Sequence, residues 1–123
     1  MRVLLVDDEK KFALTLAKRL ELRGIQVKFV YSGAEAIKIT RQGERFDVAV
    51  LDVKMPGIGG IELRHELSDL DPGLKFIFLT GHGSNIDFEA GATEAAFYLA
   101  KPLKIDELVE TLQKLVKANS RQP

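Results

Sequence analysis

The sequence predicts an α/β fold, a doubly wound parallel sheet with helices on both faces, and two observations support this prediction. Four short apolar runs, at residues 3–6, 48–51, 76–79 and 95–100, show no alternation of polar and apolar positions. Such runs are typical of strands buried on both sides, as the strands of a parallel sheet are. Segments with helical spacing separate the runs, so the expected order is a strand followed by a helix, repeated five times.

The remaining elements follow from periodicity. A fifth strand is expected at residues 26–30, where polar and apolar residues begin by alternating, as in an edge strand with one wetter face. A helix is expected around residues 86–94, where Gly91 interrupts a thin apolar stripe. Four other helices are predicted by short sets of apolar residues interspersed with polar ones. These stripes are Phe12, Leu16 and Leu20; Ala36, Ile37 and Ile39; Ile61, Leu63, Leu67 and Leu70; and Leu108, Val109, Leu112, Leu115 and Val116.

Local signals mark the expected ends of these helices. Gly24 is suited to close the first helix, and the turn at residues 71–73 closes the third. Ser32 precedes Glu35 by three positions, which is the spacing of a capping box at the start of the second helix. Asp106 is expected to cap the last helix.

Length and composition limit the class of protein. The 123 residues predict one domain, which we assign to residues 1–119, followed by a polar tail at residues 120–123. Lys and Arg total 18 and Asp and Glu total 18, a balance that argues against direct binding of nucleic acid. The absence of cysteine excludes disulfides, thiol catalysis and thiolate zinc sites. The longest apolar run has six residues where membrane insertion needs about 20, so we expect a cytoplasmic protein.

Polar residues follow the apolar runs at the point where each predicted strand ends. Asp7 and Asp8 follow the first run and Asp52 ends the second. Thr80 follows the third run and Lys101 the fourth. Because the carboxyl ends of parallel strands share one edge of the sheet, where open α/β sheets bind ligands, we expect these side chains to converge on one site.

Taken alone, each of these residues has a structural explanation, as a helix cap, a turn residue or a solvated lysine. Taken together they do not, because three carboxylates crowded at one edge repel one another unless a cation intervenes. One divalent cation and one lysine bring the formal charge to zero. Mg²⁺ fits best, since it prefers oxygen ligands and often completes its shell with phosphate oxygens. Phosphoryl chemistry is therefore the favoured hypothesis.

At these positions the sequence resembles the receiver domain of two-component response regulators. The resemblance covers nearly the whole chain and depends on an ordered set of motifs. These are Asp7-Asp8, Leu51-Asp52, Met55-Pro56-Gly57, Leu79-Thr80-Gly81, Tyr98 and Lys101-Pro102. The resemblance implies a flavodoxin-like (βα)5 fold with strand order 2-1-3-4-5, as in a chemotaxis regulator of the family.

The resemblance also implies roles for the residues of the site. Asp52 would be the phosphoacceptor, a carboxylate nucleophile that forms an acyl phosphate. Asp7 and Asp8 would bind Mg²⁺ together with Asp52 and the backbone carbonyl of Lys54. Lys101 would pair with the phosphoryl oxygens and neutralise the charge that develops during transfer.

A conformational switch and two kinds of partner are implied as well. Thr80 would move to hydrogen-bond the phosphoryl group, and Tyr98 would turn inward in response. A sensor histidine kinase or a histidine phosphotransfer protein would be the phosphodonor. A downstream target would dock on the face of the fourth helix, fifth strand and fifth helix. Such a chain is a phosphoacceptor that assists its own phosphorylation and dephosphorylation, not a turnover enzyme.

Other positions of the resemblance concern the surroundings of the site. The bond between Lys101 and Pro102 would be cis. Lys54 and His82 occupy places where the family varies and where side chains tune autodephosphorylation. Gly81 offers no side chain over the pocket, which predicts easy access for a phosphodonor.

Several alternatives stay open from the sequence. A stand-alone receiver that relays phosphoryl groups or docks a target is favoured over the excised receiver domain of a larger transcriptional regulator. A Mg²⁺-dependent phosphohydrolase with an aspartyl-phosphate intermediate is disfavoured. Haloacid-dehalogenase-type phosphatases have an Asp-x-Asp motif after their first strand, whereas in this sequence Asp7 and Asp8 are adjacent. A flavin-binding module is disfavoured, because no phosphate loop rich in Ser, Thr and Gly follows the first strand, where two acids would repel phosphate without a metal. A phosphorylation-independent adaptor would be expected to lack Asp52, Thr80 or Lys101, and all three are present.

Overall fold

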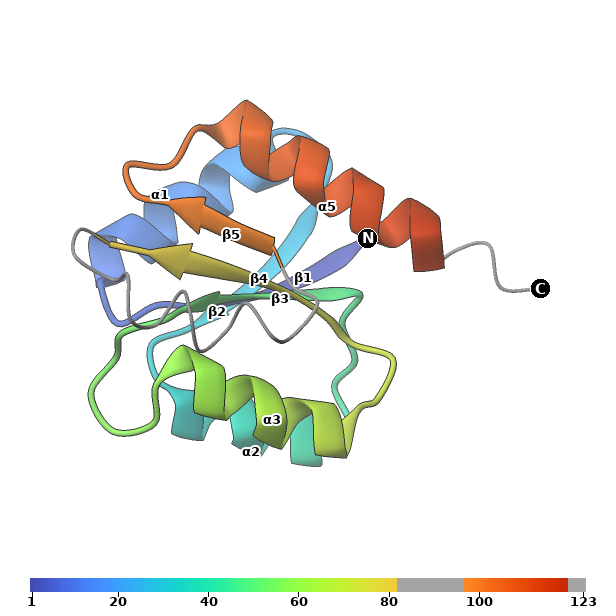
Figure 1. Ribbon diagram of the computed structural model, residues 1–123. Helices are drawn as coiled ribbons and strands as arrows, with labels where there is room; N and C mark the ends of the chain where they lie inside the picture. Colours follow the sequence, from blue (N-terminus) through green and yellow to red (C-terminus); the bar gives the residue numbers. More distant parts are fainter. Residues whose placement is uncertain (82–96, 120–123) are drawn as a thin grey trace.

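In the computed structural model, which describes residues 1–81 and 97–119, strands and helices alternate along the chain (Figure 1). The strands are β1 (Arg2–Val6), β2 (Gln26–Val30), β3 (Val48–Asp52), β4 (Lys75–Thr80) and β5 (Phe97–Ala100). The helices are α1 (Lys10–Glu21), α2 (Gly33–Arg41), α3 (Gly60–Leu70) and α5 (Ile105–Asn119). The helix expected around residues 86–94 lies outside the described residues. Within the described ranges, no helix is long and apolar enough to cross a membrane.

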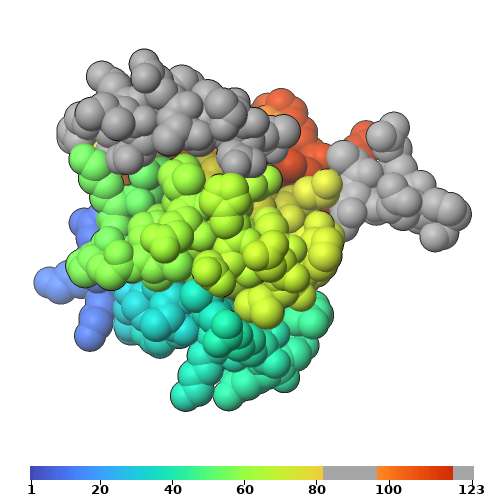
Figure 2. All heavy atoms as spheres, turned by 60° about the horizontal axis from the view of Figure 1, so that its bottom comes forward, coloured from blue at the N-terminus to red at the C-terminus, as the bar shows by residue number. Residues whose placement is uncertain are grey.

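The five strands form one parallel sheet in the order β2-β1-β3-β4-β5, which confirms the doubly wound, flavodoxin-like fold. Helices α1 and α5 cover one face of the sheet, and α2 and α3 cover the other (Figure 1). Figure 2, which brings the α2 and α3 side forward, shows these two helices side by side. The strand order reverses between β1 and β3, and ligands bind doubly wound sheets at such a switch point.

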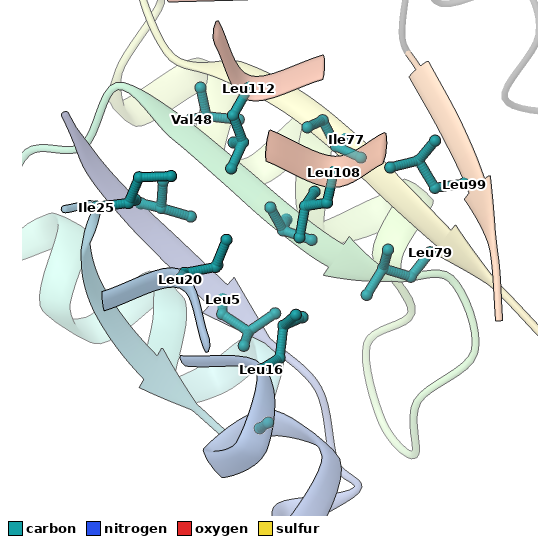
Figure 3. Close-up of a cluster of buried hydrophobic side chains, with 13 residues drawn as sticks. Leu5, Leu16, Leu20, Ile25, Val48, Ile77, Leu79, Leu99, Leu108 and Leu112 are labelled. Carbon is teal, nitrogen blue, oxygen red and sulfur yellow. The ribbon is translucent and has the colours of Figure 1, made fainter. Parts of the chain in front are cut away.

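The core is divided in two by the sheet, because successive residues of a strand point to opposite faces. Val3 and Leu5 pack with α1 and α5 (Figure 3), whereas Leu4 and Val6 pack with α2 and α3. Every residue of β3 is buried. This two-sided burial explains why the central strands read as uninterrupted apolar runs. The edge strand β2 is wetter, as its alternation predicted, and Lys28 is exposed.

The predicted helix ends agree with the structure except at α5. Ser32 caps α2 by accepting a hydrogen bond from a backbone N–H of its first turn at 3.2 Å. Gly24 follows α1 with a φ of 81°, a left-handed conformation suited to glycine. The prediction that Asp106 caps the last helix is wrong, because α5 begins one residue earlier. Asp106 lies in the first turn and pairs with Arg23, which follows α1, at 2.6 Å. Asp106 therefore forms its tertiary ion pair from within the first turn of α5.

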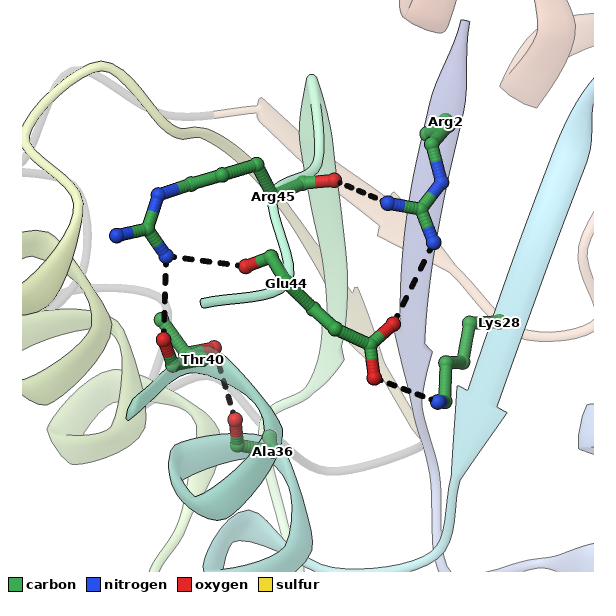
Figure 4. Close-up of polar contacts among 6 residues, drawn as sticks. All are labelled: Arg2, Lys28, Ala36, Thr40, Glu44 and Arg45. Carbon is green, nitrogen blue, oxygen red and sulfur yellow. Dashed lines mark hydrogen bonds and ion pairs between the residues drawn. The ribbon is translucent and has the colours of Figure 1, made fainter. Parts of the chain in front are cut away.

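Exposed charges pair with one another at the amino end of the sheet (Figure 4). Glu44 accepts a hydrogen bond from Lys28 Nζ at 2.7 Å, and its other oxygen lies 3.4 Å from Arg2 Nη2. The hydrogen bond from Lys28, helped by Arg2, holds the pKa of the Glu44 carboxyl below its ordinary value. The Arg2 guanidinium also donates to the carbonyl oxygen of Arg45 at 2.7 Å. Two cations therefore share one carboxylate here, whereas the opposite end of the sheet gathers carboxylates around one lysine.

Candidate functional site

The polar residues predicted to converge lie at the carboxyl edge of the sheet. Asp52 is the last residue of β3 and Thr80 the last residue of β4. Asp7 and Asp8 follow β1 directly, and Lys101 follows β5. Because all neighbouring strands are parallel, these positions fall at the same edge. The strand ends thus bring together residues from distant parts of the chain.

Strand periodicity also decides which side chains share a face of the sheet. Asp7, Asp52 and Lys101 each lie two residues beyond a core residue that packs on the side of α1 and α5. Those core residues are Leu5, Val50 and Leu99. With a period of two along a strand, the three charged side chains are placed on the same side. The cluster is therefore a continuation of the apolar core in Figure 3 to the edge of the sheet.

Lys101 is the cation of this cluster. Its Nζ lies 3.0 Å from Oδ2 of Asp7 and 3.6 Å from Oδ2 of Asp52. It also donates a hydrogen bond of 2.6 Å to Glu9 Oε1, and it lies 4.5 Å from the centroid of the Phe12 ring. Burial opposes the charge of the ammonium, but the hydrogen bonds to Glu9 and Asp7 outweigh that penalty and raise the pKa of Lys101. The lysine is therefore charged at any physiological pH.

The pKa of the Asp52 carboxyl is raised above its ordinary value. Burial is the largest cause, and the negative charge of Asp7 adds to it, so the pKa of Asp52 rises from 3.8 to about 6. The charge of Lys101 and a hydrogen bond from the backbone N–H of Lys54 act in the opposite direction. Carboxyl groups with such shifts cluster at functional sites. At neutral pH the group is ionised, although its charge is poorly solvated.

Asp7 is the most deeply buried acid of the cluster. Burial raises the pKa of its carboxyl, and a hydrogen bond of 2.9 Å from the backbone N–H of Glu9 to Oδ1 acts against that shift. Oδ2 of Asp7 has no exposed surface, and its 3.0 Å contact with Lys101 is an ion pair without the alignment of a good hydrogen bond. A buried carboxylate oxygen in this state favours a further cation.

The donor set fits a hard metal ion. One carboxylate oxygen from each of Asp7, Asp8 and Asp52 lies within 4.8 Å of the other two. Asp8 is exposed whereas the other two are buried, so the cluster reaches from the core to the solvent. Oxygen ligands with this charge suit a divalent cation such as Mg²⁺ or Ca²⁺. The residues present can therefore hold a metal ion.

The loop after β3 fits closely around Asp52. Gly57, in the predicted Met55-Pro56-Gly57 motif, has a φ of 77°, which a side chain would disfavour. Gly60 donates its backbone N–H to Val53 O at 2.9 Å. A Cβ at Gly60 would clash with the backbone carbonyl of Asp52. The glycine pair at residues 59–60 is thus a loop-to-helix turn, as the absence of a Walker pattern predicted.

Thr80 and Tyr98 lie on the other side of the sheet from Lys101. The ring of Tyr98 stacks on Phe78 with centroids 5.2 Å apart and an interplanar angle of 26°, and its hydroxyl is buried. Thr80 is partly exposed and lies two residues beyond Phe78, so it belongs to the same side. The carbonyl of Thr80 accepts a hydrogen bond of 2.8 Å from the backbone N–H of Lys101. The main chain of Thr80 is therefore in direct contact with the main chain of Lys101.

The structure bears on four further positions around the site. The bond between Lys101 and Pro102 is cis, as expected. A Cβ at Gly81 would meet no atom of residues 1–81 and 97–119 within 4 Å, and the easy access of a phosphodonor stays a prediction. The side chain of Lys54 is exposed, and its predicted role as a carbonyl ligand stays a prediction. His82 lies outside the described residues.

Two contacts of Lys101, with Glu9 and Phe12, were not predicted. Together with Pro102 and Leu103, these residues line a groove of about 550 Å³ between α1 and the segment after β5. The acidic triplet at residues 7–9 is visible in the sequence, but Glu9 and Lys101 are separated by 92 positions. No local pattern indicates which acids of the triplet the lysine contacts.

Known proteins resemble this chain over nearly its whole length. Residues 3–113 match the family model of the response regulator receiver domain. The chain is 37% identical over 110 residues to a response regulator receiver protein of Anaeromyxobacter sp. (strain Fw109-5), covering 89% of this chain and 46% of that protein. It is 35% identical over 122 residues to the transcriptional regulatory protein TrcR of Mycobacterium tuberculosis, covering 98% and 47%. The chain thus spans about half the length of these two relatives.

A further relative and a solved structure match from end to end. The response regulator receiver protein CpdR of Brucella abortus is 33% identical over 116 residues, with 94% of this chain and 96% of CpdR covered. The crystal structure of a receiver domain protein from Clostridium thermocellum superimposes with a TM-score of 0.91 at 27% identity, covering 99% and 98% of the two chains. The sheet order, the acidic edge with its lysine and these similarities agree. The chain belongs to the response regulator receiver domain family, the phosphoryl-accepting signalling switches of two-component systems.

Proposed function

We propose that Asp52 accepts a phosphoryl group from a phosphohistidine of a sensor histidine kinase or a histidine phosphotransfer protein. The observation that supports this proposal most is the position of Asp52 between a lysine and two further carboxylates. Its Oδ2 lies 3.6 Å from Lys101 Nζ, and one of its carboxylate oxygens lies within 4.8 Å of one oxygen of Asp7 and one of Asp8. A nucleophilic carboxylate, a charge-neutralising lysine and a metal-binding acid pair are the parts that phosphoryl transfer needs.

Asp52 suits the role of nucleophile better than its two neighbours. The side chain of Asp7 has no exposed surface, so a phosphodonor cannot reach it. Asp52 is buried but keeps 9% of its side chain exposed at the edge of the sheet. Asp8 is exposed and lies on the solvent side of the cluster. We assign it the role of a metal ligand and not that of the nucleophile.

The transfer exchanges one bond to phosphorus for another. A carboxylate oxygen of Asp52 attacks the phosphorus, the phosphorus–nitrogen bond of the phosphohistidine breaks, and its electron pair stays on the ring nitrogen of the donor. Lys101 offsets the negative charge that develops on the phosphoryl oxygens during transfer. Mg²⁺, bound by Asp7, Asp8, Asp52 and the backbone carbonyl of Lys54, would supply further charge neutralisation. The same groups would assist hydrolysis of the acyl phosphate, so the domain would help to set its own phosphorylated lifetime.

The conformational switch is proposed to involve Thr80 and Tyr98. Both lie on the side of the sheet opposite Lys101, and the main chain of Thr80 contacts the main chain of Lys101. A hydrogen bond from the Thr80 hydroxyl to the phosphoryl group would change the packing around Tyr98. The face made by β5, α5 and the predicted fourth helix would then bind a downstream target in the phosphorylated state.

Two settings for this switch are supported by relatives of different length. CpdR, which matches over 96% of its length, supports the setting of a stand-alone receiver. TrcR, which matches over 47% of its length, favours the receiver domain of a larger regulator. In either setting we place the domain in the cytoplasm and assign it to residues 1–119, with residues 120–123 as a tail.

The test is intact-mass measurement after incubation with a small phosphoryl donor and Mg²⁺. We expect the wild-type chain to gain the mass of one phosphoryl group, and we expect Asp52→Asn to gain none. Asp69→Asn, which removes an exposed carboxylate of α3, is the matched control and should be phosphorylated like the wild type. Phosphorylation of Asp52→Asn to the wild-type extent would contradict the proposal.

A further inference from the structure

We propose that Glu9 is a positioning residue that competes with the phosphoryl group for Lys101 and thereby favours the unphosphorylated state. The inference rests on the function proposed above, in which Lys101 binds the phosphoryl oxygens. It assigns a role to the third acid of the triplet at residues 7–9, which the proposed chemistry does not use.

The contacts of Lys101 place it closer to Glu9 than to the phosphorylation site. Its Nζ lies 2.6 Å from Glu9 Oε1, compared with 3.0 Å for Asp7 and 3.6 Å for Asp52. The ring of Phe12 holds the same ammonium 4.5 Å from its centroid, within the range of a cation–π contact. Two groups from the start of α1 therefore draw Lys101 away from Asp52.

Glu9 is not required there as a helix cap. It is the residue before α1, yet its side chain makes no capping hydrogen bond, and glutamate is not among the favoured capping residues. Its backbone N–H donates to Asp7 Oδ1 at 2.9 Å, which holds the main chain of Glu9 against the acidic cluster. The Glu9 side chain is thus not used to cap α1, and its carboxylate accepts the hydrogen bond from Lys101 instead.

The direction of the effect follows from charge. An ammonium has three N–H donors, and the oxygens of Glu9, Asp7 and Asp52 all lie within hydrogen-bonding or ion-pairing distance. Phosphorylation replaces the single charge of Asp52 by a group of about two negative charges that needs the same donors. When Lys101 moves toward the phosphoryl oxygens, its 2.6 Å contact with Glu9 lengthens, and the Glu9 side chain, which is 62% exposed, is solvated by water instead. The bond to Glu9 is therefore part of the free-energy difference between the two states.

Binding of beryllofluoride, a phosphoryl analogue, at saturating Mg²⁺ tests this competition. The affinity would be measured by ¹⁹F NMR titration of the wild type, Glu9→Gln and Glu9→Asp. We expect Glu9→Gln to bind about two- to five-fold more tightly, the range of one partly exposed ion pair. Glu9→Asp keeps the charge but is one methylene too short for the 2.6 Å contact, so it should also bind more tightly.

Two controls separate the contact from general charge effects. Glu21→Gln removes the same charge at the other end of α1 and should leave the affinity unchanged. In a Lys101→Met background, Glu9→Gln should give no gain, because the partner for which Glu9 competes is absent. Unchanged or weaker binding by Glu9→Gln would overturn the inference, as would an equal gain in the Lys101→Met background. A wild-type chain that binds no beryllofluoride, or an Asp52→Asn variant that binds it equally well, would instead overturn the proposed function and this inference with it.

Discussion

The ammonium of Lys101 lies 3.0 Å from Oδ2 of Asp7, a carboxylate without exposed surface. A buried ion of this kind is tolerated only while its partner is present. Because Lys101 also lies 3.6 Å from Asp52, one lysine compensates two buried acids at the edge of the sheet. The same arrangement that suits phosphoryl chemistry therefore carries a cost in stability, and that cost can be measured.

Replacing Lys101 by Met should destabilise the fold. The substitution keeps the aliphatic stem but leaves the carboxylates of Asp7 and Asp52 without their cation. We expect the free energy of unfolding to fall by about 1–3 kcal/mol at about pH 7 in chelator, measured by urea denaturation. Lys114→Met, which removes a lysine from an exposed pair with Glu110, should change it by less than about 0.5 kcal/mol. Equal losses in the two variants would contradict the argument.

The pH dependence of stability should report the pKa of Asp52, which is about 6 in the folded state against an ordinary value of 3.8. The folded protein binds this proton more tightly than the unfolded chain does, so stability falls as the pH rises through this window. Asp52→Asn removes the titrating group. In chelator it should match the wild type at about pH 4 and exceed it by about 2–3 kcal/mol at about pH 7.

Urea denaturation of both proteins across this pH range would measure the difference. Asp69→Asn, on the exposed side of α3, should keep the wild-type profile. Parallel profiles for the wild type and Asp52→Asn would show that the carboxyl titrates normally.

Replacing Asp8 by Asn should weaken Mg²⁺ binding while leaving stability in chelator unchanged. Asp8 is exposed, so its charge is solvated without a partner, but it supplies one of three anionic ligands. We expect a loss of about ten-fold or more in affinity by calorimetric titration, since even outer-shell changes cost about that much. An affinity equal to that of the wild type would place the metal elsewhere.

Gly60→Ala should destabilise the protein although alanine is the better helix former. A Cβ at this first residue of α3 would clash with the backbone carbonyl of Asp52, which cannot move without shifting the end of β3. We expect a loss of about 1–3 kcal/mol in the free energy of unfolding. At Gly73 the nearest atom to an added Cβ is 3.9 Å away, so Gly73→Ala should be nearly neutral. A neutral Gly60→Ala would mean that β3 and α3 adjust freely.

Much of the fold could be predicted because each strand carries its own signal. The run at residues 48–51 is apolar throughout because both faces of β3 are covered. Consecutive residues of the strand are therefore all apolar, which makes the strand visible in the sequence. The strand ends at Asp52, Thr80 and Lys101 could be located in the same way. Helix ends were less secure: α5 begins one residue before Asp106, whose ion-pair partner Arg23 is far away in the chain.

The sequence by itself determined the parallel sheet and the set of polar residues at its carboxyl edge, since both follow from local patterning and strand direction. Tertiary structure alone decided that Lys101 contacts Glu9 at 2.6 Å and Asp52 at 3.6 Å, and that burial raises the pKa of Asp52 to about 6. Electrostatic interactions depend on distance and on the local dielectric, not on separation along the chain. Both quantities exist only after the strands have paired in register and the helices have covered the sheet.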